Sequence, residues 1–393
     1  MIRGRNIVCV ASGWFDHPTS KHHVMRLLAE HNHVMWVSCH ASRRPSLTGG
    51  DAAAVLRRLR QVWAGPQRVA PGIDVITPLL VPLPESPLIR WLNTDLLAAR
   101  IRSALRRLPP RPVQLWLFAP DAPGLARRLD AERVVYYCVD DFAAFAGFNT
   151  ELIERLERQT LAASDVVIAT SQELYDARRG EHNNVHLVPH GVDYEHFAAA
   201  VDAPAPIPED LRAIPRPIFG YFGLISEYVD LELLGQAARR RPDWSFVLLG
   251  DRRTDEQPVV GLPNVHLLGG RPYADLPAYC RGFDVGLIPF RMSRLIRAVN
   301  PIKLREYLAA GLPVVSAPMS AVQSYAPAVR TAEELDDFLA ACAAALVDAE
   351  QVPPSARQKL VQAESWRSRV EWLSRIVAGE SSSEQPPTLS RAG

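Results

Sequence analysis

Short apolar runs alternate with amphipathic helical segments along most of this chain, and this alternation restricts the fold more than any other feature. In the first half the expected strands are Asn6–Ser12, His33–Cys39, Gly72–Pro78, Val113–Phe118, Arg133–Val139, Asp165–Thr170 and Val185–Pro189. The expected helices between them are Lys21–Asn32, Arg90–Leu108, Glu151–Ala162 and Gln172–Gly180. Strands rich in Val and Ile that alternate with helices form parallel sheets with helices on both faces. The pattern therefore predicts an α/β, doubly wound fold.

Proline interrupts the pattern at residues 198–217 (AAAVDAPAPIPEDLRAIPRP), after which it restarts. Because proline continues neither a helix interior nor a central strand, we place a linker there, between an N-terminal domain of residues 1–197 and a C-terminal domain of residues 218–352. The second set of strands is expected at Ile218–Gly223, Trp244–Gly250, Asn264–Leu268, Asp284–Pro289 and Leu312–Ala317, with helices at Val229–Arg241, Ala274–Gly282 and Ile302–Ala310. A helical segment at 353–378 could pack back on the N-terminal domain, and we expect residues 379–393 to be disordered.

Size and composition agree with two globular domains. The chain has 393 residues, of which 48% are hydrophobic and 22% charged, a balance that permits a large core. Because no apolar run is long enough for a membrane span or a secretion signal, we expect a cytoplasmic protein. The five cysteines are widely spaced and predict reduced core residues. With neither an Asp-x-Asp triplet nor a His/Cys cluster, the sequence predicts no requirement for a metal ion.

Charge is distributed unevenly, with a net +10 over residues 1–113 and −9 over the remainder. A basic surface could meet nucleic acid, an anionic membrane or an acidic substrate. The segments Asp51–Gly65 and Arg90–Leu108 place arginines beside apolar helical positions, which suits peripheral docking on an anionic membrane, although packed helices with solvated arginines would look the same. The apolar positions of the second segment are Trp91, Leu97, Ile101 and Leu105. Nucleic acid is disfavoured, because no stacking platform or recognition motif accompanies the charge.

The most informative motif is NPIKLREYLAAGLPVVSA, from Asn300 to Ala317. Glu306 lies one turn before a helix end, where Gly311 can adopt a positive φ and Pro313 stops the helix before a buried strand. The motif resembles the Glu-Ala-x-Ala-x-Gly-x-Pro-Val-Val pattern of GT-B glycosyltransferases, in particular the group 1, family 4-like enzymes. In that family the glutamate accepts hydrogen bonds from the nucleotide ribose, so the resemblance implies this role for Glu306. The alternative is an exposed helix glutamate before an ordinary helix end.

Other segments extend the resemblance over most of the chain. Ser20–Val37 is similar to the family's first helix and second strand, Val188–Asp193 to its Pro-Asn-Gly-Val-Asp motif, and Asn264–Leu287 to its C-terminal βαβ stretch. The resemblance implies two Rossmann-like domains facing a cleft, with the donor on the C-terminal domain and the acceptor on the N-terminal one. It also implies a metal-independent, hexosyltransferase-type enzyme that moves a sugar from a nucleotide-sugar, expected to be a UDP-sugar. The acceptor would be a saccharide or lipid-linked hydroxyl in bacterial polysaccharide or glycoconjugate synthesis.

The donor motifs also depart from the family. The first of its two glutamates is replaced by Ala298, and the Arg and Lys that usually hold the diphosphate are missing from the segment that starts at Gly223. The departing diphosphate still needs cationic or amide partners. We therefore predict that Lys303, which opens the Glu306 helix, takes this role. The remaining candidate donor contacts are Gly223, Asn300 and Arg291, followed by Arg294 and Arg297; the arginines could equally be a solvated loop face.

Asp140 and Asp141 follow the expected strand Arg133–Val139 and are the candidate catalytic bases. Adjacent strand residues point to opposite faces, so only one of the two can face the cleft. A carboxylate base suits direct, inverting displacement, and the pair resembles the xanthan glucuronosyltransferase-like branch. Retaining members often have a histidine at the preceding strand end, where this chain has Phe118–Asp121. The alternative role for the pair is a helix N-cap with a first-turn acid.

Gly13 after the first strand, and Lys21 and His22 at the first helix, are candidates for the acceptor side. Ser12–His17 is not a Gly-x-Gly-x-x-Gly fingerprint, which disfavours a nicotinamide dehydrogenase. Two alternatives to a glycosyltransferase stay open from the sequence: a nucleotide-sugar 2-epimerase of the same fold, and a non-catalytic nucleotide-sugar-binding protein.

Overall fold

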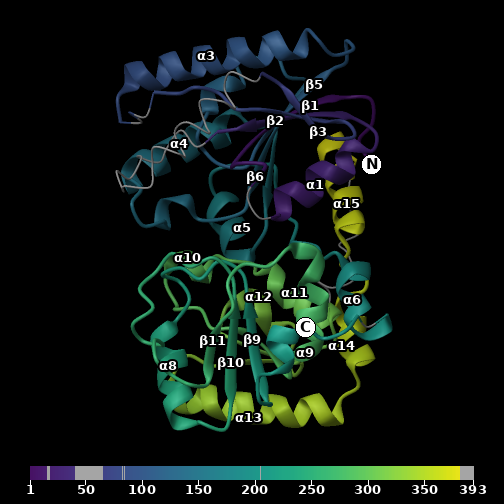
Figure 1. Cartoon of the computed structure of the whole chain (residues 1–393). Coiled ribbons are helices and arrows are strands. Elements are labelled where there is room, and N and C mark those ends of the chain that lie inside the picture. Colours follow the sequence, from purple (N-terminus) through teal and green to yellow (C-terminus); the bar gives the residue numbers. More distant parts are fainter. Residues whose placement is uncertain (16–17, 40–64, 82, 84, 204, 381–393) are drawn as a thin grey trace. The chain divides into compact units, whose positions relative to one another are not determined.

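The computed structural model describes residues 1–15, 18–39, 65–81, 83, 85–203 and 205–380 (Figure 1). These residues form two compact units, which are described one at a time. The first unit comprises Met1–Pro189 together with the final helix from Arg369 onward, and the second comprises His190–Ser368.

An eight-stranded sheet forms the centre of the first unit, in the order β3-β4-β2-β1-β5-β6-β7-β8. Its strands are β1 (Asn6–Ala11), β2 (His33–Ser38), β3 (Gln67–Ala70), β4 (Ile73–Ile76), β5 (Val113–Leu117), β6 (Arg133–Cys138), β7 (Val166–Ala169) and β8 (Val185–Leu187). All seven expected strands form, and they pair in parallel. The eighth, β3, is an antiparallel edge strand beside β4. Because parallel strands are covered on both faces, β1 is buried along its whole length.

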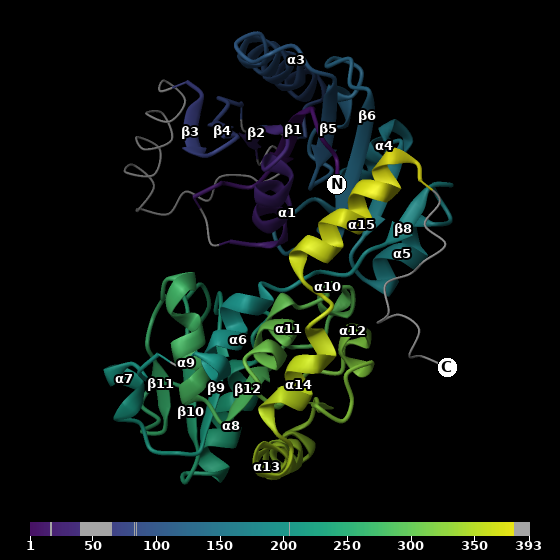
Figure 2. The same ribbon diagram turned by 90° about the vertical axis from the view of Figure 1, so that its right-hand side faces the viewer.

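The helices of the first unit include one that comes from the far end of the chain. They are α1 (Ser20–Ala29), α3 (Pro87–Leu105), α4 (Thr150–Ala163), α5 (Gln172–Arg178) and α15 (Trp366–Ala378). Ser86 caps α3 by accepting a hydrogen bond from the Ile89 amide at 3.4 Å, with Pro87 in the first turn. Figures 1 and 2 both show α15 beside α1, where it buries Val370 and Leu373.

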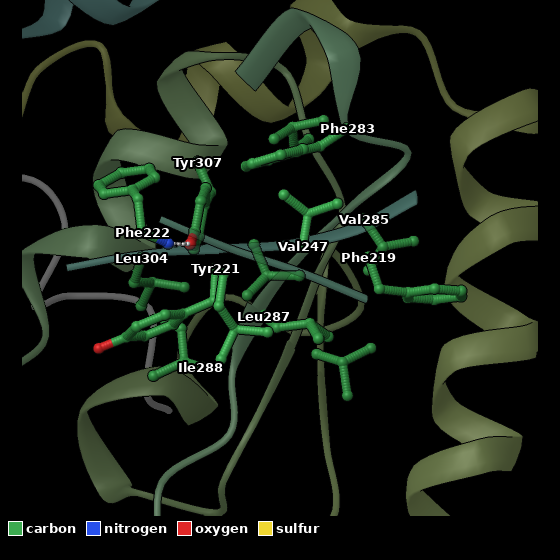
Figure 3. Close-up of a cluster of buried hydrophobic side chains, with 14 of the residues drawn as sticks. Phe219, Tyr221, Phe222, Val247, Phe283, Val285, Leu287, Ile288, Leu304 and Tyr307 are labelled. Atoms are coloured by element: carbon green, nitrogen blue, oxygen red, sulfur yellow. Dashed lines mark hydrogen bonds between the residues drawn. The ribbon is translucent and has the colours of Figure 1, made fainter. Parts of the chain in front are cut away.

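The second unit is built on a six-stranded parallel sheet in the order β11-β10-β9-β12-β13-β14. Its strands are β9 (Ile218–Phe222), β10 (Ser245–Leu249), β11 (Val265–Leu267), β12 (Val285–Ile288), β13 (Val314–Ser316) and β14 (Val329–Thr331). Its helices are α6 (Tyr194–Asp202), α7 (Glu209–Arg212), α8 (Leu231–Arg240), α9 (Leu276–Gly282), α10 (Arg294–Arg297), α11 (Ile302–Ala309), α12 (Ser320–Gln323), α13 (Leu335–Gln351) and α14 (Pro354–Val361). The Tyr307 hydroxyl accepts a hydrogen bond from the Phe222 amide at 3.1 Å within the core, which ties α11 to the end of β9 (Figure 3).

The expected linker at 198–217 differs from the structure. The second unit begins at His190, and the alanine-rich start of the expected linker belongs to α6, whose Phe197 is fully buried in the core of that unit. The short helix α7 follows and buries Leu211 there. Apolar anchors and helix-favouring alanines thus outweigh the neighbouring prolines.

The expected helical segment at 353–378 is divided into α14 and α15, and the chain between them pairs with the start of the second unit. The Val192 amide donates to the Glu364 carbonyl at 3.0 Å, and the Trp366 amide donates to the Val192 carbonyl at 3.1 Å. Gly191 permits this approach, because a Cβ at that position would lie 2.8 Å from the Trp366 Cα.

Candidate functional site

Two glycines shape the carboxyl edge of the second sheet. Gly223 follows β9 with a φ of +128°, and Gly250 follows β10 with a φ of +159°. The Gly223 amide donates to the Leu249 carbonyl at 2.8 Å. A Cβ on Gly250 would lie 1.8 Å from the Gly223 carbonyl oxygen. Side chains would therefore block this close approach of the two turns, and the carboxyl ends of parallel strands are where α/β sheets bind ligands.

Lys303, in the first turn of α11, lies directly against Gly223. A Cβ on Gly223 would come within 2.3 Å of Cε and 2.6 Å of Nζ of Lys303. The lysine Nζ is also 5.7 Å from the centre of the Tyr221 ring. Burial lowers the pKa of Lys303, and the nearby Glu306 carboxylate partly opposes this effect. The structure thus brings together two of the predicted donor residues, Gly223 and Lys303, from positions 80 residues apart.

Glu306 lies one turn after Lys303 on the same helix and is only 5% exposed. Burial raises the pKa of Glu306 to about 7; Lys303 and a hydrogen bond from Tyr273 lower it, and the Asp193 carboxylate raises it further. The Tyr273 hydroxyl donates to Glu306 Oε1 at 3.4 Å. The alternative of an exposed helix glutamate is therefore excluded. A buried carboxylate with a weak internal donor can accept further hydrogen bonds.

Tyr273, the hydrogen-bond donor to this carboxylate, is held by His196, and neither residue is predicted from the sequence. The two rings stack with their centres 4.9 Å apart, and His196 Nε2 lies 2.9 Å from the Tyr273 carbonyl oxygen. Tyr273 precedes α9 and His196 belongs to α6, so no sequence spacing connects them to Glu306.

Asn300 and Arg291, two predicted donor contacts, both interact with other side chains of the protein. The Asn300 side chain is buried, and its Oδ1 accepts a hydrogen bond from Arg305 Nη1 at 2.6 Å. Arg305 Nε donates in turn to Glu364 Oε2 at 2.6 Å. The Asn300 side-chain oxygen thus anchors α11, and the contact of Asn300 with the donor stays a prediction. The Arg291 guanidinium pairs with Asp230 at 3.2 Å, which favours the alternative of a solvated loop arginine.

In the first unit, Asp140 and Asp141 follow β6 directly. Asp140 is partly buried; burial raises the pKa of Asp140 to about 7, the nearby Lys21 lowers it, and Asp141 raises it. Asp141 stands before the 3₁₀ turn Phe142–Ala144, and its carbonyl accepts from the Ala144 amide at 2.9 Å. Its carboxylate makes no capping hydrogen bond to this turn. A raised pKa beside a lysine fits a proton acceptor that works near neutral pH.

The acceptor-side candidates separate into one charged group and one core residue. Lys21, in the first turn of α1, acts electrostatically on Asp140. His22 is buried: its Nδ1 accepts from the Thr19 amide at 3.1 Å, so its Nε2 donates to the Trp14 carbonyl, also at 3.1 Å. Burial lowers the pKa of His22 to about 4. The prediction that His22 faces an acceptor is therefore wrong, because both ring nitrogens are used internally.

Gly13 lies between the end of β1 and Trp14, where it is partly buried. Across the described part of the chain, no group of three His, Cys, Asp or Glu side chains is arranged to hold a metal ion.

Comparisons with known proteins agree with this arrangement. Residues 216–349 match the family model described as Glycosyl transferases group 1. A Bacillus subtilis (strain 168) relative, described as the teichuronic acid biosynthesis glycosyltransferase TuaH, is 29% identical over 273 residues, which cover 64% of this chain and 68% of the relative.

Two solved structures show the same fold. A sucrose-phosphate synthase from Thermosynechococcus elongatus has a TM-score of 0.69 at 15% identity and covers 95% of this chain and 98% of its own. An E. coli structure described as trehalose-6-phosphate bound with UDP-2-fluoro glucose has a TM-score of 0.63 at 12% identity, with the same coverages of 95% and 98%. With its two parallel sheets, its family match and its relative, this chain is a glycosyltransferase of the GT-B fold.

Proposed function

We propose that the second unit binds a UDP-sugar, with the Glu306 carboxylate accepting hydrogen bonds from the ribose hydroxyls and Lys303 contacting the diphosphate. One observation carries this proposal: a lysine and a carboxylate, one helical turn apart, lie at a glycine turn at the carboxyl edge of a parallel sheet. The UDP-2-fluoro glucose named for the E. coli structure supports the donor class. The proposal requires no metal ion, since Lys303 and the amides at the start of α11 supply positive potential.

The proposed chemistry is a displacement at the anomeric carbon of the donor sugar. The acceptor hydroxyl oxygen forms a bond to this carbon, while the bond from the carbon to the diphosphate oxygen breaks and its electron pair stays on the diphosphate. Lys303 stabilises the charge that develops there. Asp140 accepts the proton of the acceptor hydroxyl. A carboxylate in this role is suited to inversion of configuration.

We propose further that the acceptor is a saccharide or a lipid-linked saccharide and that the enzyme works at an anionic membrane surface. The name of the B. subtilis relative links that protein to teichuronic acid biosynthesis, which supports this acceptor class. None of the described helices combines the length and apolarity that crossing a bilayer needs. Of the two segments predicted to dock, Asp51–Gly65 lies outside the described residues except for its last one. In the other, Leu97 and Ile101 are buried in the first unit and so cannot meet a membrane.

A panel of nucleotide sugars tests the donor assignment. The readout is the shift in melting temperature of the protein, because a ligand at 100 times its Kd adds roughly 2.7 kcal/mol of stability. We expect one UDP-sugar to stabilise the wild type, and Glu306→Ala and Lys303→Met to lose most of this shift. Lys359→Met, an exposed lysine of α14, is the matched control and should keep it. Equal stabilisation of all four proteins would contradict the assignment, and product formed without an acceptor would instead indicate an epimerase.

A further inference from the structure

An exposed apolar surface lies on the first unit, over α3 and the segment before it. Its members are Leu79, Val81, Leu83, Leu88, Trp91, Leu92 and Leu96, each between 37% and 70% exposed. The side chain of buried Asn93 joins the two parts, because its Oδ1 accepts from the Val81 amide and its Nδ2 donates to the Val81 carbonyl, both at 2.9 Å. We call these seven residues the α3 surface. Soluble proteins rarely expose so many large apolar side chains together.

In its first half the helix α3 carries apolar side chains on its exposed face as well as on its buried face. Leu88, Leu92 and Leu96 recur every four residues along the exposed face, whereas Leu97 and Ile101 on the other face pack in the core. In the second half of α3 the exposed side chains are basic, with Arg100 and Arg102, and the exposed Arg106 and Arg107 follow directly after the helix end at Leu105. The acidic residues near this face include Glu85, Asp95, which is paired with Arg128, and Asp121, which lines a pocket together with Trp91.

We infer that the α3 surface rests on an anionic lipid bilayer, with the leucines and Trp91 in the interface and the four arginines over acidic headgroups. The chemistry of the surface favours an anionic bilayer as the partner. Its apolar side chains suit the acyl region of the leaflet, and the neighbouring arginines suit the acidic headgroups. A second copy of the chain fits less well. Antiparallel pairing of two α3 helices would set leucines against arginines, and parallel pairing would set arginines against arginines. The inference rests on the proposed function, in which the acceptor is presented at a membrane.

Co-sedimentation of the full chain with vesicles tests the inference. The probes are phosphatidylcholine vesicles and phosphatidylcholine vesicles that contain phosphatidylglycerol. We expect the wild type to bind the anionic vesicles, and a variant with Leu88→Gln, Leu92→Gln and Leu96→Gln to bind them at least about tenfold more weakly. Arg100→Gln with Arg106→Gln and Arg107→Gln should weaken binding and reduce its dependence on salt.

The matched control is Val347→Gln, which removes a 48% exposed apolar side chain from α13 in the second unit and should leave vesicle binding unchanged. Equal binding of the wild type and the leucine variant would overturn the inference. The inference would also be overturned if the wild type bound neither kind of vesicle but dimerised through these leucines, as measured by light scattering. UDP affinity, measured on the same proteins by calorimetry, tests the donor proposal separately from the membrane inference. A wild type that binds UDP but not vesicles refutes only the α3 surface, whereas binding of vesicles without UDP refutes the donor proposal.

Discussion

Gly223→Ala provides the sharpest test of the donor site, because it displaces Lys303 without changing any charged residue. The new Cβ would lie 2.3 Å from Lys303 Cε, so the lysine, a flexible side chain, must rotate away. A φ of +128° also strains an alanine backbone, which costs on the order of 1–2 kcal/mol of folding stability. Loss of a hydrogen bond to a charged group costs roughly 1.5–3 kcal/mol, so UDP affinity should fall by ~10–100-fold.

Gly261→Ala is the matched control for backbone strain. Its φ is +78°, and no atom lies within 4 Å of the position of its Cβ. Both variants should therefore melt at lower temperature than the wild type, while only Gly223→Ala loses affinity for UDP in calorimetry. Uridine, which lacks the diphosphate, should bind Gly223→Ala nearly as well as it binds the wild type. If UDP affinity falls equally in both variants, or in neither, Lys303 does not contact the diphosphate.

Four further predictions concern the carboxylates. Glu306→Ala should weaken UDP binding by roughly 1.5–3 kcal/mol, and unchanged affinity in a folded variant would exclude Glu306 from the ribose site. Asp140→Asn should lower turnover by ~10²–10⁴ and leave donor affinity nearly intact; if it and Asp141→Asn both keep full turnover, the base lies elsewhere. Because the pKa of Asp140 is raised from 3.8 to about 7, wild-type turnover should rise with pH through about 7. Folding stability should instead fall as pH rises from about 4 to about 7, because in that range the unfolded chain releases the proton that folded Asp140 keeps, and it should level off above about 7. Asp140→Asn should therefore gain melting temperature relative to the wild type between about pH 4 and pH 7 and gain no more above it. Glu364→Gln leaves the buried Arg305 without its ion pair and should destabilise the protein by ~3–5 kcal/mol in urea unfolding, whereas a loss below ~1 kcal/mol would show that the pair contributes little.

The sequence predicts most of the fold, because its buried strands are short, mostly apolar runs separated by amphipathic helices. It misses β3 and β14, which are short edge strands with few apolar residues. It also divides α6 between the N-terminal domain and the linker at residue 198, since local composition there does not reveal that Phe197 is buried in the core of the second unit.

The candidate site is only partly readable from the sequence. Glu306 is identified by its position before a glycine and a proline, which are local signals. The contact between Gly223 and Lys303 depends on how α11 packs against β9, and no spacing encodes it. His22 illustrates the opposite error: its residue type suggests chemistry, but its hydrogen bonds with Thr19 and Trp14 make it part of the core.

The origin of α15 affects how the protein is made. Its buried residues Val370, Leu373 and Ile376 complete the first unit, yet they leave the ribosome after every described residue of the second unit. The nascent first unit must therefore wait with part of its apolar surface uncovered while the second unit is synthesised and can fold. For this chain the domain that is translated first is the last to be finished.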